Sequence, residues 1–318
     1  MYEHRGWRVA VTCETDGVSL QVWLAVALAL VTAFLYALSN VLELTEAEQV
    51  PDEEAASATL MAHLIRKPRW WLGLGADVFG YVTQASAIAL AAVIFVEPIL
   101  ATGIVMSLIL GAFMTHRKIR AVDWLWAALL SGGLALFLYE VLPTGGRDFI
   151  PNNRAVIAMP AIVGAMGACI LAAGGFRGST RSALLGVAAG ISFGAAAVLT
   201  KSVVSYLGDG IFDWVPHWEP YALALASVGG VVINQSAFQT GALAASVGAM
   251  ESMAPLSAAI LGIVLLDEHV ECESPFQVFA VVCSIAIVLI GIMQLARAEE
   301  RIVVGDVVTR VINEPATD

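Results

Sequence analysis

Residues 84–92 read Gln-Ala-Ser-Ala-Ile-Ala-Leu-Ala-Ala, and residues 235–245 read Gln-Ser-Ala-Phe-Gln-Thr-Gly-Ala-Leu-Ala-Ala. Each stretch leads to a glutamate in apolar sequence with a proline beside or near it, namely Glu97 before Pro98 and Glu251 before Pro255. Each then continues to a polar turn and one further apolar run. The chain therefore repeats itself, with an offset of ~150–157 residues.

These stretches belong to a series of nine apolar runs, each long enough to cross a hydrocarbon core of ~30 Å as a helix. The chain is 59% hydrophobic and only 14% charged, whereas soluble domains carry about 25% charged residues. We therefore expect an all-α polytopic membrane protein with nine transmembrane helices. The expected spans are 20–42, 70–90, 93–115, 121–141, 155–175, 182–206, 220–242, 246–266 and 277–297.

The repeat relates spans 1–4 to spans 6–9 and leaves span 5 as a linker helix. Because one extra helix separates the copies, the second copy enters the membrane from the opposite side, which predicts two inverted four-helix repeats. This arrangement is typical of alternating-access transporters. The expected organisation is an outer segment (1–19), a first repeat (20–141), a linker with span 5 (142–181), a second repeat (182–297) and a polar cytoplasmic tail (298–318). Residues 52–67 are a candidate interfacial helix.

The chain also resembles a known family. Its 4+1+4 plan, with Trp-Trp-Leu-Gly-Leu-Gly-Ala-Asp at 70–77, is similar to the drug/metabolite transporter superfamily. Residues 190–194, 199–201 and 235–239 resemble the EamA-type bacterial members, and the double tryptophan is nearest the nine-helix branch that includes the NIPA-like magnesium transporters. The resemblance covers residues ~20–297 and implies a transporter. It departs at Glu97-Pro98 and near Glu251, where the NIPA-like pattern carries Thr-Pro.

Away from the ends of the expected spans, four charged residues occur: Asp77, Glu97, Lys201 and Glu251. Placing a charged side chain at the centre of a membrane-spanning helix costs ~2.5–3.5 kcal/mol on insertion scales, so each of these residues is a candidate for a functional role. Pro255 removes the N–H that the Glu251 carbonyl would accept, and Pro98 does the same for Ile94, so both prolines predict helix breaks with a carboxylate beside a free carbonyl. Glu97 is expected nearer the outer interface, with the weaker functional role.

Asp77 lies about seven residues into span 2, which is too deep for its short side chain to reach water easily. It is therefore a candidate proton- or cation-coupling residue, the alternative being a hydrogen bond to a neighbouring helix. Lys201 either extends its long stem to the outer interface or faces a cavity, where it binds an anionic solute or pairs with a carboxylate.

Small and amide residues complete the candidate set. Asn40, Gln84, Asn234, Gln235 and Gln239 are amides in apolar spans. They either hold helices together or, as with the repeat-related Gln84 and Gln235, face one central cavity. Gly186, Gly190 and Gly194 recur every four residues along span 6 and predict close helix packing.

The net charge is −11 and no basic stripe occurs, which argues against nucleic-acid binding. All five histidines fall in expected loops or tails, and no metalloprotease, nucleotide or paired-cysteine motif is present, so we expect neither an enzyme nor a cofactor.

The expected partners are the lipid bilayer and a small polar solute or cation, with a homodimer left open. The favoured hypothesis is a secondary transporter or exporter of a small polar solute. The alternatives are a magnesium-type transporter with Asp77, Glu97 and Glu251 as oxygen ligands, and a non-transporting scaffold or lipid-handling factor.

The basic residues predict the orientation in the plasma membrane. Eleven Lys and Arg residues fall on the side of the C-terminus, four on the side of the N-terminus, and Lys201 lies within a span. The positive-inside rule then places the C-terminus in the cytoplasm and the N-terminus outside.

We expect a tag after Asp318 to be accessible only from the cytoplasm and a tag before Ser19 only from outside. Tags on the same side of intact cells would contradict nine spans. Cys13 and Cys272 would both lie on the outer side, and a disulfide between them is one alternative.

Overall fold

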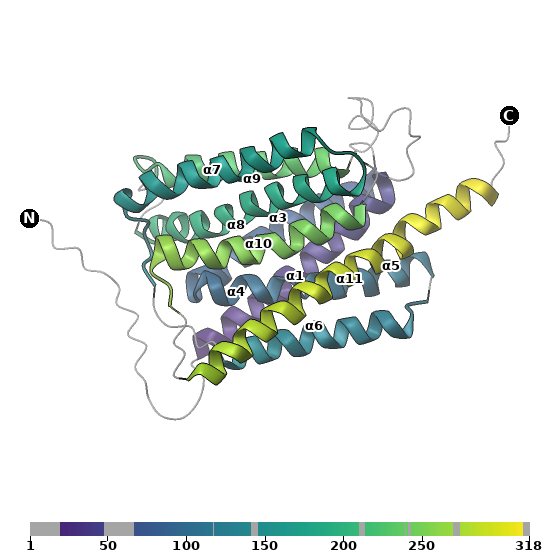
Figure 1. Ribbon diagram of the computed structural model, residues 1–318, viewed down its shortest axis with the longest axis horizontal. Helices are drawn as coiled ribbons and strands as arrows, with labels where there is room; N and C mark the ends of the chain where they lie inside the picture. Colours follow the sequence, from purple (N-terminus) through teal and green to yellow (C-terminus); the bar gives the residue numbers. More distant parts are fainter. Residues whose placement is uncertain are drawn as a thin grey trace, which may run out of the picture.

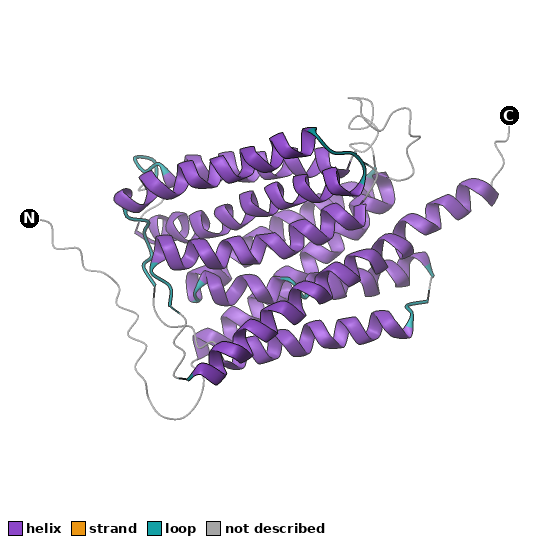
Figure 2. Cartoon of the chain, viewed as in Figure 1, coloured by secondary structure: helices purple, strands orange, loops and turns teal. Residues whose placement is uncertain are grey.

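Helices make up every regular element of the described chain (Figure 2). The computed structural model describes residues 20–47, 67–116, 118–140, 146–209, 214–238, 240, 243–269 and 274–313. Cys13, Cys272, Gln239 and residues 52–66 of the candidate interfacial helix lie outside these ranges. The helices are α1 (Leu20–Ala47), α3 (Pro68–Leu90), α4 (Val93–Leu100), α5 (Gly103–Thr115), α6 (Ala121–Glu140), α7 (Asn152–Gly174), α8 (Ser179–Asp209), α9 (Glu219–Phe238), α10 (Leu243–Leu266) and α11 (Pro275–Asn313).

These helices match the nine expected spans closely, with α4 and α5 together forming the third. Eight spans in the described chain are long and apolar enough to cross a bilayer. Helix α3 is also long enough, with 23 residues, but it carries Arg69, Asp77 and Gln84 and is more polar. The expectation of an all-helical protein with many membrane-span-like helices is confirmed. The inverted relation of the two halves stays a prediction.

The third span contains the interruption that was expected near Pro98, whereas two other helices differ from expectation. The third span is interrupted at Ala101 and Thr102, just after Pro98, and the Thr102 hydroxyl there donates to the Ile99 carbonyl at 2.7 Å. Helix α10, by contrast, continues through Pro255 to Leu266. The predicted break at Pro255 is therefore wrong: one missing backbone bond is tolerated in a helix that neighbouring groups support. Helix α11 continues to Asn313, well beyond the expected end at residue 297.

The helices lie roughly side by side, so their ends form two opposite faces of the bundle (Figure 1). We call the face where α1 begins and α10 ends the N-side, and the face where α11 ends the C-side. In the first half, α1 packs on α3, α4 and α5; in the second half, α8 packs on α9 and α10. Helices α4 and α10, and likewise α6 and α11, pack against each other and join the halves. Helix α7 packs mainly on α8.

The glycine face of α8 lies directly on the backbone of α10. A Cβ on Gly190 would come 2.7 Å from the Met250 carbonyl oxygen, and one on Gly194 would come 2.6 Å from the Ala254 carbonyl oxygen. Gly186 meets the Ser246 carbonyl in the same way. Glycine therefore permits the close approach along this whole face, and it explains how α10 is held straight at Pro255.

We expect Gly190→Ala to destabilise the folded protein by about 1–3 kcal/mol, because backbone atoms of α10 cannot move aside for the new methyl group. Gly164→Ala is the matched control, since a Cβ there would meet nothing within 4 Å. It should leave stability unchanged or raise it slightly, because alanine favours helix. Thermal unfolding of the purified variants in detergent measures both effects. Equal melting temperatures would contradict the tight α8–α10 contact.

Candidate functional site

A chain of polar side chains crosses three helices of the first half. The Tyr36 hydroxyl on α1 donates to Gln84 Oε1 on α3 at 2.6 Å. Gln84 Nε2 in turn donates to Glu97 Oε1 on α4 at 2.8 Å. Because a phenol that donates must meet the amide oxygen, Tyr36 fixes the Gln84 amide with its NH₂ group toward Glu97. Glu97 is only 6% exposed, so its carboxyl group does not reach water in this structure; its expected place nearer the outer interface stays a prediction.

Glu251 of α10 faces this chain from the second half. Helices α4 and α10 pack together, and the charges of Glu97 and Glu251 are close enough to interact. Glu251 also interacts electrostatically with Glu299 of α11, a buried carboxyl group that is hydrogen-bonded to Ser107 of α5. No basic side chain of the described residues forms an ion pair with any of these three glutamates. Sequence reasoning missed Glu299 because it assigned residue 299 to the tail.

Asp77 lies on the same face of α3 as Tyr81 and Gln84, at helical spacing. This face points into the bundle, since the Tyr81 hydroxyl lies 3.0 Å from the Thr200 hydroxyl of α8 and Gln84 contacts Glu97. Asp77 is nevertheless exposed, and its charge interacts with the Tyr36 phenol. Asp77 stands in the C-side half of α3.

The other predicted amides are not gathered at this site. Asn40 is exposed near the C-side end of α1, and Gln235 is exposed on α9. Gln84 and Gln235 therefore do not face one shared cavity, which corrects that expectation. Asn234 Oδ1 is buried without a hydrogen-bond partner among the described residues. The unpaired Cys169 and Cys283 are half-buried in α7 and α11.

Lys201 does not extend to the outer interface but pairs with a buried carboxylate. Its Nζ atom lies 3.0 Å from Glu268 Oε1, and the two side chains are 9% and 0% exposed. Glu268 also accepts the backbone N–H groups of Val93 at 2.8 Å and Ile94 at 2.9 Å. Sequence reasoning missed Glu268, because it lies in a polar Asp-Glu-His turn that gives no sign of burial.

A second ion-pair group lies beside Glu268 on the N-side. Asp267 pairs with Arg154 and with Arg147, whose Nε lies 2.7 Å from Asp267 Oδ2. The hydrogen bond from Arg154, and then the positive charges of both arginines, hold the pKa of Asp267 below its usual value. Asp267 is therefore charged throughout the neutral range and anchors the start of α7 to the end of α10.

Aromatic rings cover the neighbouring N-side end of α8. Tyr206 stacks on His217 with ring centroids 3.8 Å apart, and its hydroxyl donates to Glu219 Oε1 at 3.0 Å. Glu219 is 2% exposed. These contacts bury the Glu219 carboxyl group at the N-side end of the bundle.

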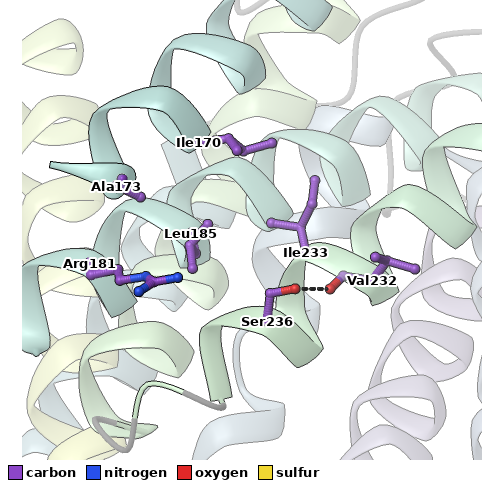
Figure 3. A pocket seen from close by; sticks show the side chains of 8 residues that line it. Ile170, Ala173, Arg181, Leu185, Val232, Ile233 and Ser236 are labelled. Carbon is purple, nitrogen blue, oxygen red and sulfur yellow. Dashed lines mark hydrogen bonds between the residues drawn. The ribbon is translucent and has the colours of Figure 1, made fainter. Parts of the chain in front are cut away.

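The structure offers no ready metal centre among the described residues. No three His, Cys, Asp or Glu side chains in these ranges lie together as a metal would require, so Asp77, Glu97 and Glu251 do not converge on one ligand set. A cavity of about 270 Å³ lies elsewhere, between α7, α8 and α9 (Figure 3). Its lining is mostly apolar, with Arg181 and Ser236 as its polar members. It is remote from the carboxyl groups.

Comparison with known proteins adds one relative. The chain is 26% identical over 275 residues to an uncharacterized protein of Corynebacterium glutamicum, an alignment that covers 86% of this chain and 95% of that protein. No family model matches the chain. No solved structure matches it.

Proposed function

We propose that this protein is a secondary transporter that moves a small polar solute across a membrane by alternating access between its two halves. Its site lies where α4 of the first half packs on α10 of the second. The principal residues are Glu97, Glu251 and Asp77, with Gln84 and Tyr36 orienting Glu97. We further propose that the chain belongs to the drug/metabolite transporter superfamily and resides in the plasma membrane, with its C-side facing the cytoplasm.

One observation carries this proposal. Two glutamates within membrane-span-like helices, one from each half, stand on helices that pack together at the junction of the halves, and neither has a basic partner among the described residues. A carboxyl group shielded from water carries an unpaired negative charge only at high cost, so it holds a proton or a cation in that state. A group that must be neutralised in one state and faces water in another is the element that ion-coupled transport requires.

The absence of a basic side chain from this set favours a neutral or cationic solute over an anionic one. The carboxyl groups would serve both to attract the solute and to exchange a proton for it. That solute would enter from the C-side, past Asp77. Lys201 does not alter this preference, because its charge is already matched by Glu268.

Flux measurements in proteoliposomes test the proposal. The purified protein is reconstituted with a trapped pH indicator, an inward proton gradient is imposed, and pools of amino acids, amines, sugars and nucleosides are added in turn. We expect at least one pool to accelerate dissipation of the gradient, relative to protein-free vesicles. Uptake of Mg²⁺ without a counter-solute would instead identify the cation transporter. No flux with any pool or ion would support the scaffold alternative and reject transport.

Tyr36→Phe should slow transport several-fold without affecting the fold. The variant removes the hydroxyl that fixes the Gln84 amide, so the amide is free to turn its oxygen toward Glu97 and repel it. Tyr139→Phe is the control, because Tyr139 is 81% exposed. Initial rates of flux at equal protein density compare the two variants. Equal rates for Tyr36→Phe and the parent would show that the Tyr36–Gln84 contact does not position Glu97.

A further inference from the structure

Glu268 joins the two halves at the N-side end. It is the second residue after the end of α10 in the second half. Its carboxylate accepts the first two N–H groups of α4 in the first half, at 2.8 and 2.9 Å. The N-cap residue of α4, Ala92, has no side chain that can cap these groups. Glu268 therefore supplies the N-terminal cap from the opposite half, where a negative charge also suits the helix dipole.

The surroundings of Glu268 are shaped around its carboxylate. Lys201 of α8 lies 3.0 Å away and balances the charge. Gly262 of α10 and Gly146, which precedes α7, leave the necessary room: a Cβ on Gly262 would come 2.5 Å from Glu268 Oε2, and one on Gly146 would come 2.8 Å from Glu268 Cγ. Four segments thus meet on one fully buried side chain.

Helix α4 connects this contact to the candidate site. Val93 and Ile94 at its beginning bind Glu268, and Glu97 one turn later binds Gln84. Any movement of α4 away from Glu268 therefore moves Glu97 as well.

We propose that Glu268, Lys201 and the N-terminus of α4 form the N-side gate of the transport path, closed in this structure, and that α4 separates from Glu268 when the path opens to the N-side. This inference rests on the proposed function and adds to it the residues that control access from one side. A buried ion pair suits a gate, because the cost of desolvating its charges largely offsets their attraction. When water enters, both charges and the freed N–H groups are solvated, so the open and closed states stay close in free energy.

Cysteine labelling tests the gate. Cys13, Cys169, Cys272 and Cys283 are replaced by serine, and Thr200→Cys provides a buried reporter next to Lys201. A membrane-impermeant maleimide is applied from the N-side. Labelling of a cysteine placed before Ser19 shows which side of the membrane this is. We expect Glu268→Gln to raise the labelling rate of the reporter at least about fivefold, as expected for a modest shift between two states.

Asp267→Asn is the matched control. It removes the neighbouring carboxylate and its ion pairs with Arg147 and Arg154, but it does not touch α4. Its labelling rate should stay near that of the parent. A Glu268→Gln rate equal to that of Asp267→Asn, with both proteins folded by gel filtration, would overturn the gate.

A charge exchange provides a second variant, which remains informative if Glu268→Gln folds poorly. Lys201→Glu with Glu268→Lys keeps the ion pair but places an ammonium group against N–H donors that it cannot cap. We expect the labelling rate of this exchanged variant to stay high. If the exchange instead restored the parent rate, the ion pair alone would close the path without the contact to α4, and the gate would be rejected. Labelling reports conformation alone, so its outcome is separate from flux. Slow labelling of the gate variants with intact flux in the parent rejects only the gate, whereas the absence of flux in the parent protein rejects the transport proposal.

Discussion

Glu97→Gln and Glu251→Gln are each expected to abolish gradient-driven flux or to uncouple it from protons, while leaving the protein folded and membrane-inserted. Glutamine preserves the shape of the side chain and removes its ability to exchange a proton. The amide is also an easier group to bury than a carboxylate, so folding should not suffer. Flux in proteoliposomes over a range of pH measures the effect for each variant.

Asp77→Asn should also reduce flux strongly, but its effect has a different cause. Asp77 is exposed, so we expect it to attract a solute toward Tyr36 and Glu97 rather than to hold a proton in the closed interior. The variant should therefore raise the solute concentration needed for half-maximal flux more than it lowers the maximal rate. An unchanged half-maximal concentration would contradict this role.

Glu300→Gln is the matched control for these variants, because Glu300 follows the buried Glu299 on α11 but is partly exposed. It should retain flux and the pH dependence of the parent. Parent-like flux and pH dependence in both Glu97→Gln and Glu251→Gln would show that these carboxyl groups are structural. The coupling mechanism would then be wrong.

The sequence predicted the helices well, because bilayer thickness fixes the length of an apolar run. The nine expected spans agree with the observed helices to within a few residues at most ends. Spacing along a single helix was informative for the same reason: Gly186, Gly190 and Gly194 lie on one face by geometry alone, and that face packs on α10.

Contacts between distant segments were harder to predict. Pro98 and Pro255 give the same local signal, yet the third span is interrupted just after Pro98 whereas α10 stays continuous. The difference lies in the neighbours, since α10 is supported along its length by the glycine face of α8. Similarly, Asp77 was expected to be out of reach of water, but it is exposed, whereas Glu97 is only 6% exposed. The position of a residue along a helix does not reveal whether its side chain faces the other helices or the surface.

Glu268 shows the same limit most clearly. In sequence it is the middle residue of a polar turn, and such turns are normally solvated. Its burial depends on Lys201, on the start of α4 and on two glycines, which are separated from it by up to 175 residues. No local pattern contains that information.

Lys201→Met is expected to destabilise the protein by about 3–5 kcal/mol, because it leaves the Glu268 carboxylate buried without a cation. The two remaining N–H donors hydrogen-bond the charge but do not neutralise it. The double variant Lys201→Met with Glu268→Gln should recover much of this loss, since the amide leaves no uncompensated charge, although its single oxygen accepts from only one of the two α4 N–H groups. Asp267→Asn, at the exposed neighbouring ion pair, should change stability little. Tryptophan fluorescence during heating in detergent measures all three, and a double variant no more stable than Lys201→Met would show that lost packing of the lysine stem, not the uncompensated charge, causes the effect.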